Sequence, residues 1–223
     1  MRTYEDKHCI EQRLSEPYII ENFITDDERV QLIDYFKKSD RKIYKITGPI
    51  TLHLDETDYK TDLFKTLLAR IQEEIHAEVY FGHFFYTQIP HIIHNDDSYD
   101  ITTPFKGINI PLETFEDTYL CIFDQYYLNG PCKFFNGSNN IPTYYNTQVY
   151  EYSNVKNLST QPFDEETRKI QFSHLERSWL EGLSIKAVFK QVPNCGIIFD
   201  TVRLHCSSNF TKSKLGLSIF TKL

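Results

Sequence analysis

Hydrophobic positions follow a helical period in the first third of the chain and a strand-like pattern after it. Apolar residues three apart, preceded by the N-cap and acidic first turn Thr25-Asp26-Asp27-Glu28, predict a helix over 26–38. Leucine and isoleucine residues four apart predict a second helix over 59–76. Around these helices, an apolar run at 17–24 predicts a short strand, and weak alternation over 41–55 predicts a strand pair.

Aromatic and β-branched residues dominate from residue 79 onward, which is typical of short strands. A third helix is expected over about 165–181, ended by Gly182. Helices first and short strands afterwards predict one domain, 1–223, that is mainly β: a double-stranded β-helix of the jelly-roll or cupin-like kind, braced by N-terminal helices. The expected strands are 79–93 with breaks at Gly82 and Pro90, 107–112, 118–124, 132–135, 185–189, 196–200 and 214–220.

Composition indicates which classes of binding partner and which cellular compartment to expect. The chain has 40% hydrophobic and 25% charged residues, as globular proteins do, and its net charge of −7 with no basic stripe argues against a nucleic-acid partner. Its five cysteines are odd in number and form no CxxC pair, so neither a disulfide framework nor a zinc knuckle is indicated. Because no apolar run resembles a signal segment or a membrane span, we expect a cytoplasmic protein with no membrane partner.

A possible metal site combines the pair His94-Asn95-Asp96 with the distant His205. Residues i and i+2 of a strand point to one face, so His94 and Asp96 can reach one ion while Asn95 points away. Two imidazoles and one carboxylate on one side of an ion form the facial triad of non-haem Fe(II) oxygenases, which leaves positions open for O2 and a reductant. An HxD pair alone more often lies in an exposed loop than in a metal site. A lone histidine is likewise more often a half-buried, hydrogen-bonded residue than a metal ligand. The ordered combination favours the metal site.

The ordered motifs of residues 79–220 resemble those of the Fe(II)/2-oxoglutarate-dependent dioxygenase superfamily, particularly its phytanoyl-CoA hydroxylase-like and prolyl hydroxylase-like branches. The resemblance leaves the insertion 136–184 uncovered, and it implies that Fe(II) is bound by the histidine and aspartate residues just named. It runs in order through His94-Asn95-Asp96, Gly130-Pro131-Cys132-Lys133-Phe134-Phe135, the segment 193–200 with its Pro-x-x-Gly turn, His205 and Lys214.

The resemblance also implies that a cation holds 2-oxoglutarate as cosubstrate. Lys214, which follows the distal histidine, is the expected cation. A lysine is a point charge, so hydroxyl donors are expected beside it: Ser207, two residues after His205, and Tyr86, at even spacing from the HxD pair. Lys212 competes for the cationic role, because the chain has Lys214-Leu215-Gly216 where many members have Arg-x-Ser.

By this resemblance the chain is expected to hydroxylate an unidentified small molecule or peptide with O2 and 2-oxoglutarate, releasing succinate and CO2. A catalytically inactive jelly-roll protein with a binding or structural role is the alternative, and a zinc hydrolase on a cupin-like barrel is a third possibility.

The insertion 136–184 is expected to fold over one end of the barrel as a lid, with Trp179 docking its helix. His91, three residues before His94, is expected at the surface. The sequence leaves the oligomeric state open.

Overall fold

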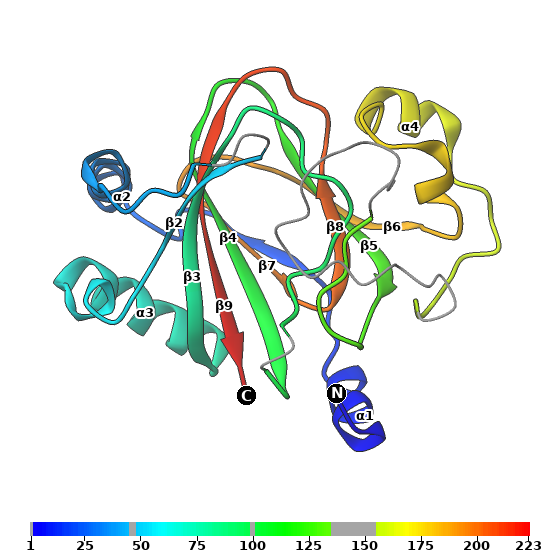
Figure 1. Cartoon of the computed structure of the whole chain (residues 1–223), viewed down its shortest axis with the longest axis horizontal. Helices are drawn as coiled ribbons and strands as arrows, with labels where there is room; N and C mark the ends of the chain where they lie inside the picture. The colour runs from blue at the N-terminus through cyan, green and yellow to red at the C-terminus, as the bar shows by residue number, and fades with distance from the viewer. Residues whose placement is uncertain (1, 45–47, 99–100, 135–154) are drawn as a thin grey trace.

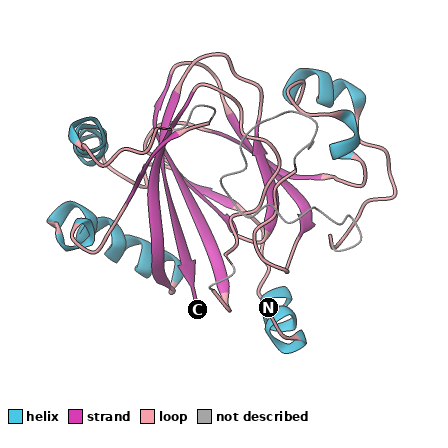
Figure 2. Cartoon of the chain, viewed as in Figure 1, coloured by secondary structure: helices cyan, strands magenta, loops and turns pink. Residues whose placement is uncertain are grey.

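Two antiparallel β-sheets form the centre of the molecule, with helices against them (Figure 1, Figure 2). The computed structural model describes residues 2–44, 48–98, 101–134 and 155–223. The large sheet has the strand order β1-β7-β4-β9-β3-β2, and the small sheet has the order β6-β5-β8. The expectation of a mainly β protein with flanking helices is confirmed.

The bounds of the elements are as follows. The large sheet contains β1 (Tyr18–Ile20), β2 (Ile50–His53), β3 (Glu78–Thr87), β4 (Pro104–Thr114), β7 (Gly196–Asp200) and β9 (Lys214–Lys222), and the small sheet contains β5 (Tyr119–Tyr126), β6 (Ile185–Lys190) and β8 (Arg203–Ser207). The helices are α1 (Tyr4–Glu11), α2 (Asp26–Lys38), α3 (Asp62–Ile75) and α4 (Glu165–Gln171), with the 3-10 helices η1 (Asp58–Lys60) and η3 (Arg177–Leu180). Among the described residues, no helix has both the length and the apolar character that a membrane span requires.

Local signals account for α2 and α3. Thr25 caps α2 in a reciprocal box: its hydroxyl accepts from the backbone N–H of Glu28, while the Glu28 carboxylate accepts from the Thr25 backbone N–H. α3 ends where His76 adopts a left-handed backbone, with φ of 55°. The helix predicted over 26–38 is confirmed, and the one predicted over 59–76 is confirmed except for its first turn, which is the separate η1.

The two faces of the large sheet have different neighbours. Phe84 of β3 and Leu217 of β9 are cross-strand partners and share one face, and both belong to the core cluster that includes the buried residues of α2 and α3. Residues of the opposite parity, such as His83 and Ser218, therefore face the small sheet. The side chains between the two sheets form the interior that carries the candidate site.

Tertiary pairing changes several expected elements. β3 continues through Gly82, where an added Cβ would lie only 3.1 Å from Leu54 and 3.2 Å from Tyr59, so the glycine permits close packing and does not break the strand. The described residues of 41–55 do not form a regular strand pair: β2 pairs with β3, and Ile43 forms an isolated bridge with Thr51. The segment around His205 is the strand β8, which is not among the expected strands.

Two further expectations are only partly met. The helix expected over 165–181 is divided into α4 and η3, followed by Gly182 at a positive φ of 73°. In place of a strand over 132–135, Lys133 forms one isolated bridge with His94, and Phe135 lies outside the described residues. α1 has no counterpart in the expectations because only Ile10 of this helix is buried, so no hydrophobic period marks it.

The described part of the insertion packs on the outer face of the small sheet. Phe172, Leu175 and Leu180 join a core cluster with alternate residues of β5 and β8, and Trp179 packs against it as expected. His205 has the opposite parity in β8 and faces the interior, so residues 155–184 lie across the sheet from it. Residues 136–154 lie outside the described residues, and the lid stays a prediction.

Candidate metal centre

Backbone pairing brings the HxD segment to β8. The N–H of His94 donates to the carbonyl of His205 at 3.0 Å, and the N–H of His205 donates to the carbonyl of His94 at 2.8 Å. The N–H of Asp96 donates to the carbonyl of Thr201 at 2.9 Å. These bonds hold two segments far apart in sequence in one antiparallel register, which sets the positions of the side chains.

The three predicted ligands converge. His94, Asp96 and His205 each offer a ligand atom, and these atoms all lie within 4.8 Å of one another. The Nε2 atom of His205 lies 3.1 Å from Oδ2 of Asp96, and that of His94 lies 3.6 Å from Oδ1 of the same carboxylate. The two imidazole centroids are 4.3 Å apart. This donor set could hold one metal ion, as the HxD spacing and the distant histidine predicted.

Backbone carbonyls orient both imidazoles. Nδ1 of His94 lies 2.7 Å from the carbonyl of Ile92, and Nδ1 of His205 lies 3.0 Å from that of Arg203. A carbonyl can only accept, so each Nδ1 carries a proton and each Nε2 is the ring nitrogen that faces the shared centre. This arrangement fits a metal site, where a ligating histidine donates its second ring N–H to a fixed acceptor.

Electrostatics favour an ionised Asp96 and a neutral His94, the forms in which these two residues bind a metal. Burial opposes ionisation of Asp96, but the neighbouring His205 and His94 outweigh it and lower the pKa of this carboxyl to about 2. Burial, together with His205 and His91, lowers the pKa of His94 well below its usual range. At neutral pH the carboxyl is therefore ionised and His94 is neutral, so no proton must leave either group before a metal binds.

Asn95 lies between the two ligands and points away from them, as the alternation predicted. Its amide donates to the carbonyls of Tyr127 and Gly130 at 3.3 and 3.1 Å, and its Oδ1 accepts from the N–H of Cys132 at 2.7 Å. These bonds tie the back of the HxD segment to the turn that follows β5.

Lys214 lies in the same interior, at the start of β9. It is 5% exposed, and its Nζ donates to Oε1 of Gln191 at 2.8 Å and to Oγ of Ser207 at 3.4 Å. Its charge also lies 4.9 Å from the ring of Phe210 and 6.0 Å from that of Phe85. Lys214 forms no ion pair with a carboxylate of the described residues, and burial lowers its pKa to about 8.

Ser207 connects the buried lysine to the metal centre. Ser207 and His205 are two apart on β8, so both face the interior. The Ser207 hydroxyl lies within reach of Lys214 and also accepts from the backbone N–H of His91 at 3.0 Å. A buried cation and the triad therefore share one side of β8.

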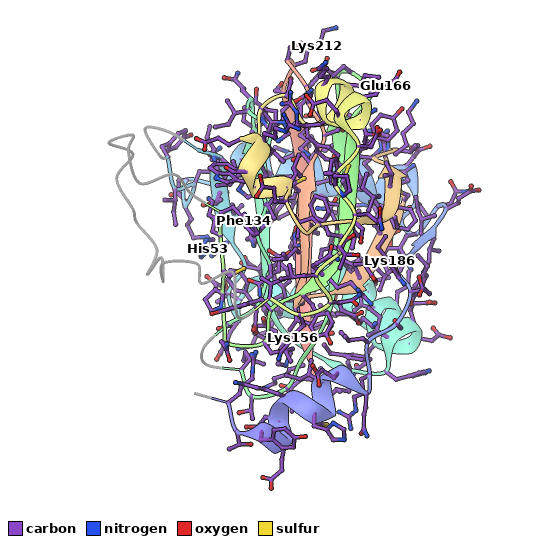
Figure 3. All side chains as sticks on the ribbon, turned by 90° about the vertical axis from the view of Figure 1, so that its right-hand side faces the viewer. His53, Phe134, Lys156, Glu166, Lys186 and Lys212 are labelled. Atoms are coloured by element: carbon purple, nitrogen blue, oxygen red, sulfur yellow. The ribbon has the colours of Figure 1, made fainter. Side chains whose placement is uncertain are left out.

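Two expectations about Tyr86 and Lys212 are resolved by the fold. Tyr86 packs against the core cluster beneath the helices, so the expectation that it donates a hydroxyl beside Lys214 is wrong. β3 ends at Thr87, so counting by twos from His94 does not carry the strand's alternation back to Tyr86. Lys212 lies in the exposed loop before β9, where its N–H contacts Glu116, and its side chain points outward at one extremity of the molecule (Figure 3).

The expectation that His91 is a surface residue is wrong. Its ring centroid lies 4.5 Å from that of His94, and burial together with Lys133 and Lys214 lowers its pKa well below the usual range. Gln191, the acceptor for Lys214, was not expected either. Both residues lie outside regular strands, so no alternation in the sequence marks which way they point.

Comparisons with known proteins find similarity in structure only. No protein-family model matches the sequence, and no curated protein sequence matches it. The structure is similar to SnoN, a non-heme alpha ketoglutarate dependent epimerase from nogalamycin biosynthesis, with a TM-score of 0.56 and 9% identity over 98% of this chain and 82% of that chain. It is also similar to a Pseudomonas putida prolyl-4-hydroxylase, with a TM-score of 0.52 and 11% identity over 97% and 98% of the two chains.

A further similar structure is SnoK, a non-heme alpha ketoglutarate dependent carbocyclase from nogalamycin biosynthesis, with a TM-score of 0.52 and 8% identity over 99% of this chain and 83% of that chain. The three enzymes differ in the reaction they are described by. At these identities the likeness concerns the arrangement of the backbone. The chain thus has the fold of these three enzymes, two of which are described as non-heme and alpha ketoglutarate dependent.

Proposed function

We propose that this chain is an Fe(II)- and 2-oxoglutarate-dependent oxygenase on a double-stranded β-helix, and that it hydroxylates a small molecule or a peptide. One observation carries the proposal: the triad and a buried lysine without a described carboxylate partner share one interior. A hydrolytic zinc site would need the triad alone. It would give no reason to bury a cation beside Ser207, which lies two residues along β8 from a metal ligand, because burial of a charge is unfavourable.

The triad would hold the iron. Two neutral imidazole nitrogens and one carboxylate are the donor set of non-haem iron oxygenases, and they leave the other coordination positions open. Iron bound there would supply the activation of O2. The backbone carbonyls of Ile92 and Arg203 keep both Nε2 atoms directed at the centre, so little reorganisation accompanies binding.

Lys214 and Ser207 would hold one carboxylate of 2-oxoglutarate. Among the described residues, the ammonium contacts neutral acceptors and aromatic rings but no carboxylate, so an incoming carboxylate gains an ion pair in a buried site and relieves an uncompensated charge. Ser207 lies two residues, roughly 6.6 Å, along the strand from His205, a span that a five-carbon dicarboxylate can bridge. SnoN has been solved in complex with Fe3+ and alpha ketoglutarate, and iron, in its Fe(II) form, together with the same dicarboxylate is proposed for this chain.

Apolar side chains would keep water from the reacting centre. The ring of Phe199 lies 4.7 Å from that of His205, and Phe85 borders the lysine. Such apolar rings beside the triad and the lysine would disfavour water there. The reaction would then consume O2 and 2-oxoglutarate and place one oxygen atom in the substrate and the other in succinate, with CO2 released.

The test is anaerobic titration with Fe(II) and 2-oxoglutarate, followed by the weak visible absorption band of the chelate. We expect the band for the wild type and none for His205→Ala. Lys214→Ala should need a higher 2-oxoglutarate concentration with metal binding nearly unchanged, while the exposed Lys212→Ala should match the wild type. Loss of iron with unchanged cosubstrate affinity in Lys214→Ala would show that the role assigned to this lysine is wrong.

An inactive binding protein is the second candidate, favoured by Gly216 in place of the expected serine two residues after the basic position. Succinate formation separates the two candidates, because a binding protein would show the chelate band without turnover. Small molecules and prolyl peptides are the first substrates to try, since the similar structures include an epimerase of nogalamycin biosynthesis and a prolyl-4-hydroxylase.

A further inference from the structure

Arg2, far from the triad in sequence, contacts the segment that contains His94 and Asp96 on the side that faces away from the candidate metal centre. Its guanidinium makes a two-pronged ion pair with Asp97, the residue that follows the ligand Asp96. It also donates to the carbonyls of Leu128, Ser98 and Ile101 at 3.1, 3.1 and 2.7 Å. The side chain of Arg2 is 7% exposed and that of Asp97 is fully buried. Such a fork is a directional contact that a flexible surface pair does not provide.

The position of this contact matters for the triad. His94 and Asp96 face the interior, so Asn95 and Asp97 face the other side, where Asn95 is bonded to the turn after β5 and Asp97 to Arg2. Each of the two ligands is therefore followed by a residue whose side chain is held by contacts on the side away from the metal centre. Without Arg2, a buried carboxylate next to Asp96 would lose its only described ion-pair partner, and the segment would have to move to solvate it.

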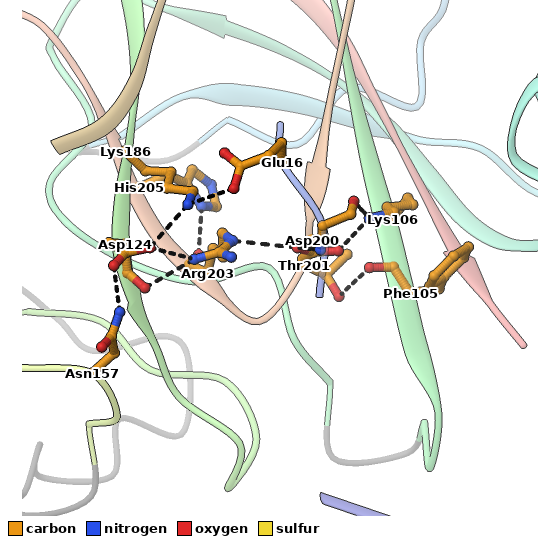
Figure 4. Close-up of polar contacts among 11 residues, drawn as sticks. Glu16, Phe105, Lys106, Asp124, Asn157, Lys186, Asp200, Thr201, Arg203 and His205 are labelled. Atoms are coloured by element: carbon orange, nitrogen blue, oxygen red, sulfur yellow. Dashed lines mark hydrogen bonds and ion pairs between the residues drawn. The ribbon is translucent and has the colours of Figure 1, made fainter. Parts of the chain in front are cut away.

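The rest of the N-terminal segment, residues 2–16, contacts the chain that leads to the other ligand. The N–H of Ser15 donates to the carboxylate of Asp200 at 3.0 Å, at the turn from β7 into β8. Figure 4 shows Asp200 bonded to Arg203, whose carbonyl orients His205. Figure 1 shows the N-terminal helix at the edge of the sheets near this turn. One segment thus touches both parts of the chain that carry metal ligands.

We propose that residues 2–16 are a strap for the metal centre and that Arg2 is a positioning residue for the HxD segment. Docking of the strap and binding of the metal are then coupled, and each favours the other by the same factor. This inference rests on the metal site of the proposed function and on no step of the oxygenase reaction. The strap acts through backbone position and touches neither metal nor substrate.

The experiment measures Co(II) affinity, by competition with a chromophoric chelator, and the Co(II) visible spectrum, which reports ligand geometry. We expect Arg2→Met to lower the affinity by about 10–100-fold, as loss of supporting contacts around metal ligands does, and to alter the spectrum. Arg2→Lys, which keeps the charge and loses the fork, should fall between. Arg13→Met is the matched control, because Arg13 lies in the same segment but is exposed, and it should match the wild type.

Two further measurements distinguish positioning from general stability. The double variant Arg2→Met with Asp97→Asn should recover affinity relative to Arg2→Met alone, because no unpaired carboxylate remains. In the wild type, Co(II) should slow tryptic cleavage after Arg13 by a factor comparable to the affinity loss of Arg2→Met. If Arg2→Met and Arg2→Lys lower the thermal stability but keep the wild-type Co(II) affinity and spectrum, the strap proposal is wrong. The proposed function is not affected by that result. A wild type that binds no Co(II) would remove the strap's role and the proposed function together.

Discussion

Replacing Lys214 with methionine should stabilise the protein while abolishing its proposed cosubstrate site. Burial lowers the pKa of Lys214 from 10.5 to about 8, and this difference corresponds to about 3 kcal/mol of cost for the charged form in the folded state. Methionine has a similar volume and no charge. It gives up the contact with Gln191 and the interaction with Phe210, together about 1 kcal/mol, so we expect a net gain of about 2 kcal/mol at pH 7.

The pH dependence gives the sign of this effect. The folded state binds the Lys214 proton more weakly than the unfolded state, so the cost is fully present below about pH 8 and disappears as the pH rises toward 10.5. The advantage of Lys214→Met over the wild type should shrink across the same window. A gain of about 2 kcal/mol corresponds to a rise in Tm of roughly 4–8 °C for a domain of this size.

The assay is thermal unfolding of both proteins without metal, at pH 7 and at steps up to pH 10.5. Lys106→Met is the matched control, because Lys106 is also buried but is paired with Asp200. Removing it leaves that carboxylate with Arg203 and the backbone N–H of Ser15, and we expect a loss of at least about 2 kcal/mol. A lower Tm for Lys214→Met at pH 7, or a difference that does not change with pH, would refute the account of an uncompensated buried cation.

Three other predictions follow from the same interior. The 2-oxoglutarate dissociation constant, measured by calorimetry with metal present, should be constant below about pH 7 and rise above about pH 8 as Lys214 loses its proton, whereas Lys214→Arg should show no such rise. Gly216→Ser should lower the urea midpoint, because its Cβ would lie 2.4 Å from the Phe85 ring, at a cost of about 1–3 kcal/mol that Phe85→Ala should relieve; equal midpoints would contradict this packing. Zn(II) at 100 times its dissociation constant should stabilise the wild type by about 2.7 kcal/mol and leave His205→Ala unchanged, while His91→Ala should retain the stabilisation, since His91 adjoins the triad without belonging to it.

The sequence alone determined the features whose signals lie within a few residues. The capping box at Thr25 and Glu28 and the four-residue apolar period of α3 are local, so both helices could be located. The HxD spacing determined that His94 and Asp96 share a side, because alternation acts over two residues. The helix α1 shows the limit of such signals, since Ile10 is its one buried residue and no apolar period marks the helix.

Only the tertiary structure decided which distant side chains meet. The alternation of β3 puts Tyr86 on the same face as Phe84, toward the helices, and the end of the strand at Thr87 leaves His91 free to lie beside the triad. Lys212 and Lys214 have the same parity, and the choice between them follows from where β9 begins to pair with its neighbours. Arg2 reaches Asp97 across 95 residues of sequence, a contact that no local pattern encodes. Such pairings depend on the packing of whole sheets, and packing energy is shared among many residues that the chain brings together only when it folds.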